Sequence, residues 1–278
     1  MPALVSTDWL ARELGASDLR VLDASWYLPQ LKRDPKAEFA AQRIPGAAYF
    51  DIDAISDASV PLPHTFPSAE QFARQVGALG VGTGDRVVCY DGLGLFSAGR
   101  AWWMFRAMGH DAVAVLDGGL PKWRAEGRAT ESGSLRPIAR AFKATVRPHL
   151  IRYFDQMRAN LDGKAEQVLD ARARGRFAGT EPEPRPGVLS GHIPGAKNLP
   201  YNELVDPKTG TLLPPDELRR RFAAAGIDLS KPVVTSCGSG VTASALALGL
   251  YLAGKTDAAV YDGSWSEWGG RADTPVET

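Results

Sequence analysis

The chain has 278 residues, of which 44% are hydrophobic and 23% charged, close to the averages for globular proteins. Lys and Arg equal Asp and Glu at 32 each, so a zero formal net charge predicts no binding to nucleic acid or anionic membranes. We find no apolar run of the roughly 18 residues that a spanning helix needs, and no secretory-signal pattern at the N-terminus. Two cysteines, Cys89 and Cys237, are too few for a secreted disulfide scaffold. With two cysteines and no clustered histidines, a structural zinc site is not expected. The low cysteine count also favours a reducing, cytoplasmic setting.

In chain order, the first half is predicted to form strand 20–24, helix 68–79, strand 87–90, helix 97–108 and strand 113–116. The second half is predicted to form helix 215–225, a strand that ends before Cys237, and helix 242–253. Ser68 is a plausible N-cap with Glu70 in the first turn, and Gly226 follows the end of a helix. The last helix is apolar on nearly all sides, which predicts burial.

Four sequence blocks occur twice, in the same order, and each later block begins 145 to 149 residues after its earlier copy. The pairs are the segments 21–25 and 168–172, which share Val-Leu-Asp-Ala; 43–48 and 192–197, which share Ile-Pro-Gly-Ala; 85–92 and 231–238, which share Val-Val; and 117–123 and 262–268, which share Asp-Gly and a final Trp. A period of a domain's length indicates a duplicated domain rather than a solenoid. Strands that alternate with helices predict an α/β fold with a mostly parallel sheet and helices on both faces in each copy. We expect domains at 1–130 and 149–278, joined by a linker at 131–148 that lacks clear periodicity.

Cys237 stands between a predicted strand and a helical pattern, where open parallel sheets place their ligands. Glycines after it let the loop curl with its amides pointing inward, and the helix N-terminus adds the positive end of a dipole. We expect these amides to favour a thiolate or a persulfide over the neutral thiol. The predicted cradle consists of Gly238, Ser239, Gly240, Val241 and Thr242.

Most single cysteines are small buried hydrophobic residues, and Cys89, inside a predicted strand, is interpreted in that way. The first copy has Asp91 at the position of Cys237, so that copy is predicted to be catalytically inactive. Cysteine phosphatases use a similar cradle but need an arginine six residues after the cysteine to clamp the phosphoryl oxygens. Ala243 stands there, which argues strongly against phosphatase chemistry.

Cys-Gly-Ser-Gly-Val-Thr at 237–242 resembles the active loop of the 3-mercaptopyruvate sulfurtransferases in the rhodanese superfamily. Further similarity lies at 22–29, at 175–185 and in the Asp-Gly-Ser-Trp-Ser-Glu-Trp segment at 262–268, so the resemblance spans almost the whole chain. It implies two tandem rhodanese-like domains with the catalytic cysteine in the second. It also implies sulfur transfer to a thiol or cyanide acceptor through a Cys237 persulfide, with release of pyruvate.

The resemblance also separates two sulfur donors. Thiosulfate-specific relatives carry Arg and Lys directly after the cysteine, whereas Gly238 and Ser239 stand here. Arg176 and Arg185 match the family's binders of the donor carboxylate and carbonyl, a task that suits guanidinium groups. The alternative interpretation of each arginine is a solvated surface charge.

One position departs from the family pattern. Relatives often have His directly before the first Ile-Pro-Gly, in a Ser-His-Asp relay with the loop serine, but Arg43 stands here. The relay is therefore not expected, although Ser239 remains a predicted catalytic residue. Arg43 is a candidate for substrate binding, with a structural role as the alternative. Asp34 would be the acid of such a relay, and its role is open. Proton delivery to the departing enolate has no predicted source.

The implied partners are a small-molecule sulfur donor and a thiol acceptor, either a small thiol or a thioredoxin-like protein. No metal ion or organic cofactor is implied. Three alternatives stay open: a thiosulfate sulfurtransferase, a non-enzymatic sulfur-relay module and a purely structural tandem domain. The intact Cys237 and its cradle argue against the third.

Overall fold

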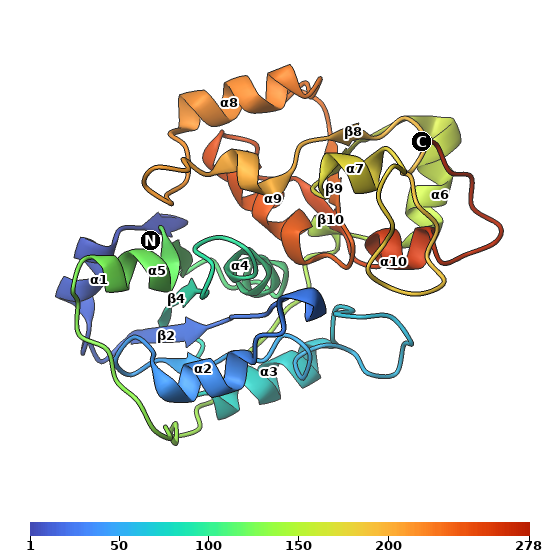
Figure 1. Ribbon diagram of the computed structural model, residues 1–278. Coiled ribbons are helices and arrows are strands. Elements are labelled where there is room, and N and C mark those ends of the chain that lie inside the picture. The colour runs from blue at the N-terminus through green and yellow to red at the C-terminus, as the bar shows by residue number, and fades with distance from the viewer. The chain divides into compact units, whose positions relative to one another are not determined.

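The computed structural model describes residues 1–278, which divide into two compact units (Figure 1). The first unit comprises residues 1–55, 67–147 and 205–212, and the second comprises residues 56–66, 148–204 and 213–278. Each unit thus includes one short segment from the other half of the sequence. The predicted domain boundaries, at 130 and 149, remain predictions about folding units.

The first unit contains β1 (Leu4–Val5), α1 (Thr7–Glu13), β2 (Leu19–Asp23), η1 (Pro29–Leu31), α2 (Pro35–Ala41), β3 (Ala48–Tyr49), α3 (Ala69–Ala78), β4 (Arg86–Tyr90), α4 (Ala98–Ala107), β5 (Val113–Leu116) and α5 (Gly119–Ala125). The second contains η2 (Pro148–Leu150), β6 (Ile151–Arg152), α6 (Phe154–Gly163), β7 (Gln167–Asp170), α7 (Arg174–Phe177), β8 (Lys197–Asn198), η3 (Tyr201–Leu204), α8 (Pro215–Ala224), β9 (Val233–Ser236), α9 (Val241–Leu252), β10 (Ala259–Tyr261) and α10 (Ser264–Trp268).

The two sheets have the same topology. The strand orders are β1-β5-β4-β2-β3 and β6-β10-β9-β7-β8, and every pairing in both sheets is parallel. Corresponding strands occupy corresponding places, with β4 and β9 at the centre of their sheets. The predicted duplication and the parallel α/β architecture are confirmed.

In the first unit, alternate residues of β4 serve the two faces of the sheet, as the two-residue period of a strand requires. Val88 and Tyr90 join a core cluster with Leu10 of α1 and Trp123 of α5. The intervening Val87 and Cys89 are also fully buried, so the other face is covered as well. Helices α3 and α4 meet through the rings of Phe72 and Phe105, whose centroids are 5.1 Å apart. Cys89 is thus a buried core residue, and burial raises the pKa of its thiol.

In the second unit, β7, β9 and β10 pack against α6 and α10 through a cluster that includes Met157, Val234, Trp265 and Trp268. Helix α9 is buried over most of its length, as its apolar composition predicted. Gly249 allows close packing there, because a Cβ would lie 2.8 Å from the Leu204 side chain. Both β9 and α9 are buried in this core, and the loop between them carries Cys237.

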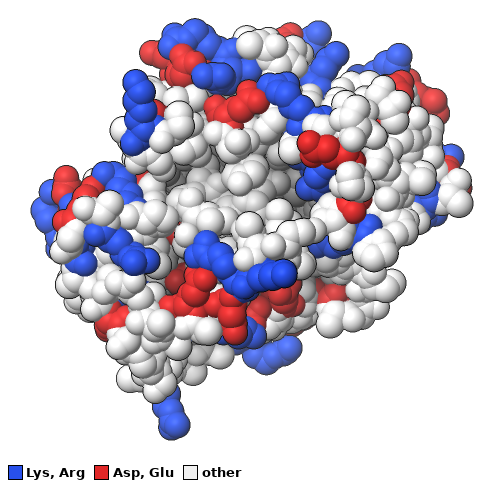
Figure 2. All heavy atoms as spheres, viewed as in Figure 1, with Lys and Arg blue, Asp and Glu red and all other residues white.

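The predicted elements match the structure to within a residue at each end, and Ser68 caps α3 by accepting a hydrogen bond from the Gln71 amide. Crossing a bilayer takes about 20 apolar residues, and no helix here meets that requirement. On the face shown in Figure 2, basic and acidic side chains are interspersed, in keeping with the balanced composition.

Candidate active site

Cys237 directly follows the central strand β9, and three residues later Gly240 forms the N-cap of α9. Gly240 has a φ of 77°, a conformation that favours glycine. The Cys237 side chain is buried, with 1% exposure, and forms no disulfide. First-turn amides of a helix have no partner within the helix, and no side chain caps α9. The strand, the turn and the helix N-terminus therefore follow one another in the predicted order, with Cys237 between the strand and the turn.

The first unit shows what this loop does with an anion. Asp91 follows β4 as Cys237 follows β9, and its carboxylate accepts five backbone hydrogen bonds of 2.8–2.9 Å. The donors are the amides of Leu93, Gly94, Phe96, Ser97 and Ala98, the last three at the start of α4. The loop that follows the central strand is thus built to surround a negative charge. In the first copy that charge is permanently a carboxylate.

The turn that begins α10 forms hydrogen bonds to the backbone of the Cys237 loop. The amide of Trp265 donates to the Cys237 carbonyl over 2.9 Å. Ser264 adopts a φ of 49°, a rare conformation for a non-glycine residue, and its hydroxyl donates to the Tyr261 carbonyl and accepts from the Cys237 amide. The segment at 262–268, recognised from sequence as a motif, is therefore a structural support for the cysteine.

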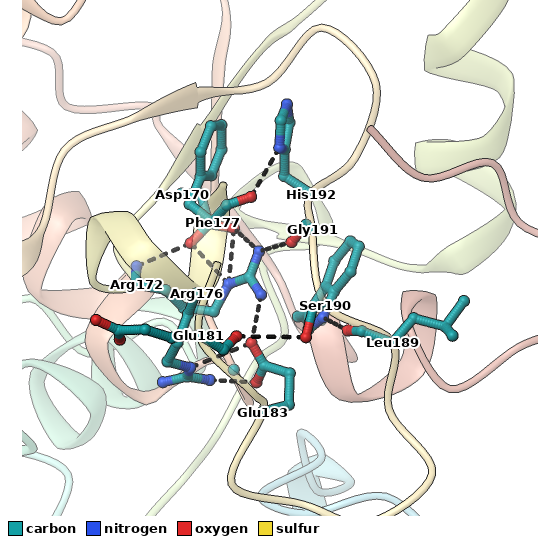
Figure 3. A network of polar contacts seen from close by, with 12 residues as sticks. Asp170, Arg172, Arg176, Phe177, Glu181, Glu183, Leu189, Ser190, Gly191 and His192 are labelled. Atoms are coloured by element: carbon teal, nitrogen blue, oxygen red, sulfur yellow. Dashed lines mark hydrogen bonds and ion pairs between the residues drawn. The ribbon is translucent and has the colours of Figure 1, made fainter. Parts of the chain in front are cut away.

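Arg176 belongs to α7 and is held by a buried network of charges (Figure 3). Glu183 accepts from its Nε at 3.1 Å and from its Nη2 at 2.5 Å. The same carboxylate accepts from Arg172, which in turn pairs with Asp170 at the end of β7. A chain of alternating charges thus fixes the Arg176 guanidinium in one orientation, with its Nη1 left for another partner.

Arg176 and Arg185 both lie beside the cysteine loop. A Cβ built on Gly238 would stand 3.2 Å from Arg176 Nη2 and 3.7 Å from Arg185 Nη1. The Nη1 of Arg185 also donates to the Ser266 hydroxyl at 3.3 Å. Two guanidinium groups from the 175–185 segment therefore converge next to the residue that follows Cys237, which suits a donor that carries a carboxylate.

His64 is a site residue that the sequence did not reveal. Its Nδ1 lies 2.8 Å from the Ser239 hydroxyl, and its side chain is buried, with 3% exposure. The neighbouring Phe66 amide donates to Asp262 at 2.7 Å, which ties the 56–66 segment to the second unit. We expected a histidine partner for Ser239 only at position 43 and therefore found none. No spacing rule connects residues 175 positions apart; the scarcity of histidine, four in the chain, was the available signal.

Arg43 does not have the surroundings of a substrate binder. It is 2% exposed in the first unit, where its Nε pairs with Glu131 at 2.8 Å and its Nη1 donates to the Gly133 carbonyl. Its guanidinium joins two segments of that unit, so we correct its assignment to a structural one. Asp34 caps α2 by accepting from the amides of Lys36 and Ala37, which gives it a local structural role.

The whole chain can be matched to known proteins. The model of the rhodanese-like domain matches residues 6–126 and again residues 154–271. The chain belongs to the rhodanese family. It is 50% identical to the human 3-mercaptopyruvate sulfurtransferase over 276 residues, which are 97% of this chain and 93% of the human one. It is 46% identical to the thiosulfate/3-mercaptopyruvate sulfurtransferase 1, mitochondrial, of Arabidopsis thaliana over 298 residues, 99% of this chain and 78% of that protein.

Among solved structures, the chain resembles the 3-mercaptopyruvate sulfurtransferase SseA from Escherichia coli, with a TM-score of 0.87 and 36% identity. The match covers 95% of this chain and 99% of SseA. The predicted tandem rhodanese fold and sulfurtransferase class are confirmed. A reaction of this class requires a sulfur donor and a sulfur acceptor, and the Arabidopsis relative is named for two donors.

Proposed function

We propose that this rhodanese-family chain transfers sulfur from 3-mercaptopyruvate to a thiol through a persulfide on Cys237. The observation that carries the proposal is the convergence of Arg176 and Arg185 on Gly238, the residue next to the cysteine. The carboxylate and the ketone of 3-mercaptopyruvate can accept hydrogen bonds from these two guanidinium groups while its sulfur faces the Cys237 thiolate. Neutral Gly238 and Ser239 leave room for this longer donor.

In the first half-reaction, the Cys237 thiolate attacks the donor sulfur and an S–S bond forms. The C–S bond breaks, and its electron pair stays with the carbon, so pyruvate leaves as its enolate. Arg176 and Arg185 stabilise the charge that develops on the enolate oxygen and the carboxylate. The cradle amides from Gly238 to Thr242 stabilise the persulfide, as the equivalent amides in the first unit hold the Asp91 carboxylate.

The enolate carbon needs a proton before pyruvate is complete. Ser239 lies in the loop, and its hydroxyl is within hydrogen-bond distance of His64 Nδ1. We propose that the Ser239 hydroxyl donates this proton and that His64 replaces it, which is general acid catalysis by a paired side chain. His64 then takes the place of the histidine that position 43 lacks.

In the second half-reaction, an acceptor thiolate attacks the outer sulfur, receives it as a persulfide and regenerates the Cys237 thiolate. The two steps make a ping-pong reaction with a covalent intermediate. A small thiol or a thioredoxin-like protein fits the acceptor role, and cyanide serves as a test acceptor. The cytoplasmic location remains our prediction from cysteine usage, and cell fractionation tests it.

The proposal is tested by intact mass after incubation with 3-mercaptopyruvate, followed by peptide mapping. We expect one added sulfur, localised to Cys237, together with release of pyruvate. Cys237→Ser should abolish both, with Cys89→Ser as the matched control that retains both. Pyruvate release by Cys237→Ser would overturn the assignment of the nucleophile.

Thiosulfate is the second candidate donor, because the Arabidopsis relative is named for both donors. The ratio of kcat/KM for the two donors decides between them, since it measures the difference in transition-state binding. We expect 3-mercaptopyruvate to be preferred. A sulfur-relay module would instead gain sulfur only from a partner protein and turn over neither donor.

A further inference from the structure

Two carbonyl groups of the cysteine loop are held by consecutive residues of α10. The Cys237 carbonyl accepts from the Trp265 amide at 2.9 Å. The Gly238 carbonyl accepts twice from Ser266, from its amide at 2.9 Å and from its hydroxyl at 2.5 Å. The Gly238 carbonyl is thus bound by one residue through two donors, a backbone amide and a side-chain hydroxyl, which fixes the plane of the peptide that it belongs to.

Fixing these carbonyls also fixes the direction of the amides across the same peptide bonds. In a trans peptide the C=O and the N–H point in opposite directions. The carbonyl of Gly238 shares its peptide with the amide of Ser239, and the structure has no cis peptide bonds. With its carbonyl held on α10, this peptide points the Ser239 amide away from α10. Ser266 therefore determines the direction of one donor of the proposed cradle.

The inactive copy provides an internal comparison at the same positions. There the Leu120 amide donates to the Asp91 carbonyl at 3.1 Å, as Trp265 does to Cys237. The residue that corresponds to Ser266 is Pro121, which has neither an N–H nor a hydroxyl to donate. The hydrogen bonds that Ser266 donates are thus present in the copy with the cysteine, and Pro121 cannot form them in the copy without it.

The Ser266 hydroxyl has a second partner. While it donates to the Gly238 carbonyl, it accepts from Arg185 Nη1 at 3.3 Å. One hydroxyl with one proton satisfies both contacts, so the direction of the loop peptide and the position of the arginine are coupled. Ser266 is 9% exposed, which shields both bonds from water.

We propose that Ser266 is a positioning residue of the sulfurtransferase site, which aligns the Gly238–Ser239 peptide for the persulfide and Arg185 for the donor carboxylate. The inference rests on the proposed function, because the persulfide and the donor carboxylate belong to that function. The hydrogen bonds of Ser266, however, are present in the protein without donor. Two measurements therefore test the hydrogen bonds and their role in the reaction separately.

The first measurement is hydrogen exchange of the donor-free protein, read in peptides that cover 237–242. Ser266→Ala removes the hydroxyl, and Ser266→Pro, which introduces the residue of the inactive copy, removes the amide donor as well. We expect exchange at the Ser239 amide to accelerate roughly three- to tenfold in Ser266→Ala, the equivalent of one neutral hydrogen bond, and further in Ser266→Pro. Ser230→Ala, an exposed serine of the same unit, is the control and should leave the loop unchanged. Equal exchange in all variants would overturn the inference even if the wild-type protein transfers sulfur.

The second measurement is steady-state kinetics with 3-mercaptopyruvate. Ser266→Ala should raise KM roughly three- to tenfold with a smaller change in kcat, because Arg185 Nη1 loses its hydrogen bond to the Ser266 hydroxyl. Ser266→Thr keeps the hydroxyl and should restore most of the loss. Alanine and threonine variants with equal defects, or an unchanged KM in Ser266→Ala, would contradict the positioning role. A wild-type protein without turnover would refute the proposed function alone, since the exchange result still decides on the support.

Discussion

At the scale of single residues, Gly238 shows how the absence of a side chain shapes a binding site. A Cβ there would lie 3.2 Å from Arg176 Nη2, closer than ordinary van der Waals contact. Arg176 cannot easily yield, because Glu183 holds it through two hydrogen bonds. No positive φ restricts this position, so the cost of a side chain is one of space rather than of backbone strain.

We therefore predict that Gly238→Ala raises KM for 3-mercaptopyruvate roughly fivefold, through displacement of the Arg176 guanidinium group. Steady-state kinetics on the purified variant measures this. Gly163→Ala is the matched control, because a Cβ at Gly163 meets nothing within 4 Å. An unchanged KM in Gly238→Ala would show that the donor does not bind between Arg176 and Arg185.

At the scale of elements, the same strand–loop–helix motif serves two purposes in one chain. After β4, the carboxylate of Asp91 binds the loop amides and joins strand and helix into one hydrogen-bonded unit. After β9, the shorter loop leads from Cys237 to Gly240 in three residues and holds a thiol instead. In the first motif a carboxylate accepts the hydrogen bonds of the loop amides, whereas in the second we propose that the amides stabilise a persulfide.

Asp91→Ala should lower the free energy of unfolding of the first unit by about 3 kcal/mol, because four buried amides and one partly buried amide lose a charged acceptor. Asp91→Asn should lose less, since its amide oxygen still accepts. Urea denaturation measures both, with Asp162→Ala, an exposed carboxylate, as the control. A stability equal to that of the wild type would mean that water replaces the carboxylate without cost.

At the scale of the whole molecule, the chain brings distant segments into one site. Residues 56–66 come from the first half of the sequence, yet they pack with the second unit and carry His64 to Ser239. The buried contact between the imidazole and the hydroxyl is the basis of the proton transfer proposed above. The second unit therefore includes a histidine from a segment that precedes its own repeat in the sequence.

We predict that His64→Asn lowers kcat for pyruvate release about 100-fold, the usual scale of general acid catalysis. Transfer from thiosulfate should fall much less, because sulfite leaves as a stable anion and needs no protonated carbon. Stopped-flow assays with the two donors measure the difference, and His149→Asn, an exposed histidine, is the control. Equal losses with both donors would indicate that His64 supports the loop rather than the proton transfer.

Much of this protein follows from its sequence alone. The repeated blocks determine two parallel α/β units, because a period-two apolar strand followed by an apolar helix can be buried in few ways. Cys237, its glycines and the helix start are contiguous, so their geometry is local and was predictable. The roles of Arg176 and Arg185 were inferred from a resemblance and remain proposals.

Only the tertiary structure decided the parts that depend on contacts between distant residues. His64 meets Ser239 across 175 positions, and Arg43 is buried with hydrogen bonds to Glu131 and to the Gly133 carbonyl. The support of the loop by Ser266 likewise joins residues 28 positions apart. Such contacts have no periodicity and no local spacing, because they result from how packed elements bring side chains together.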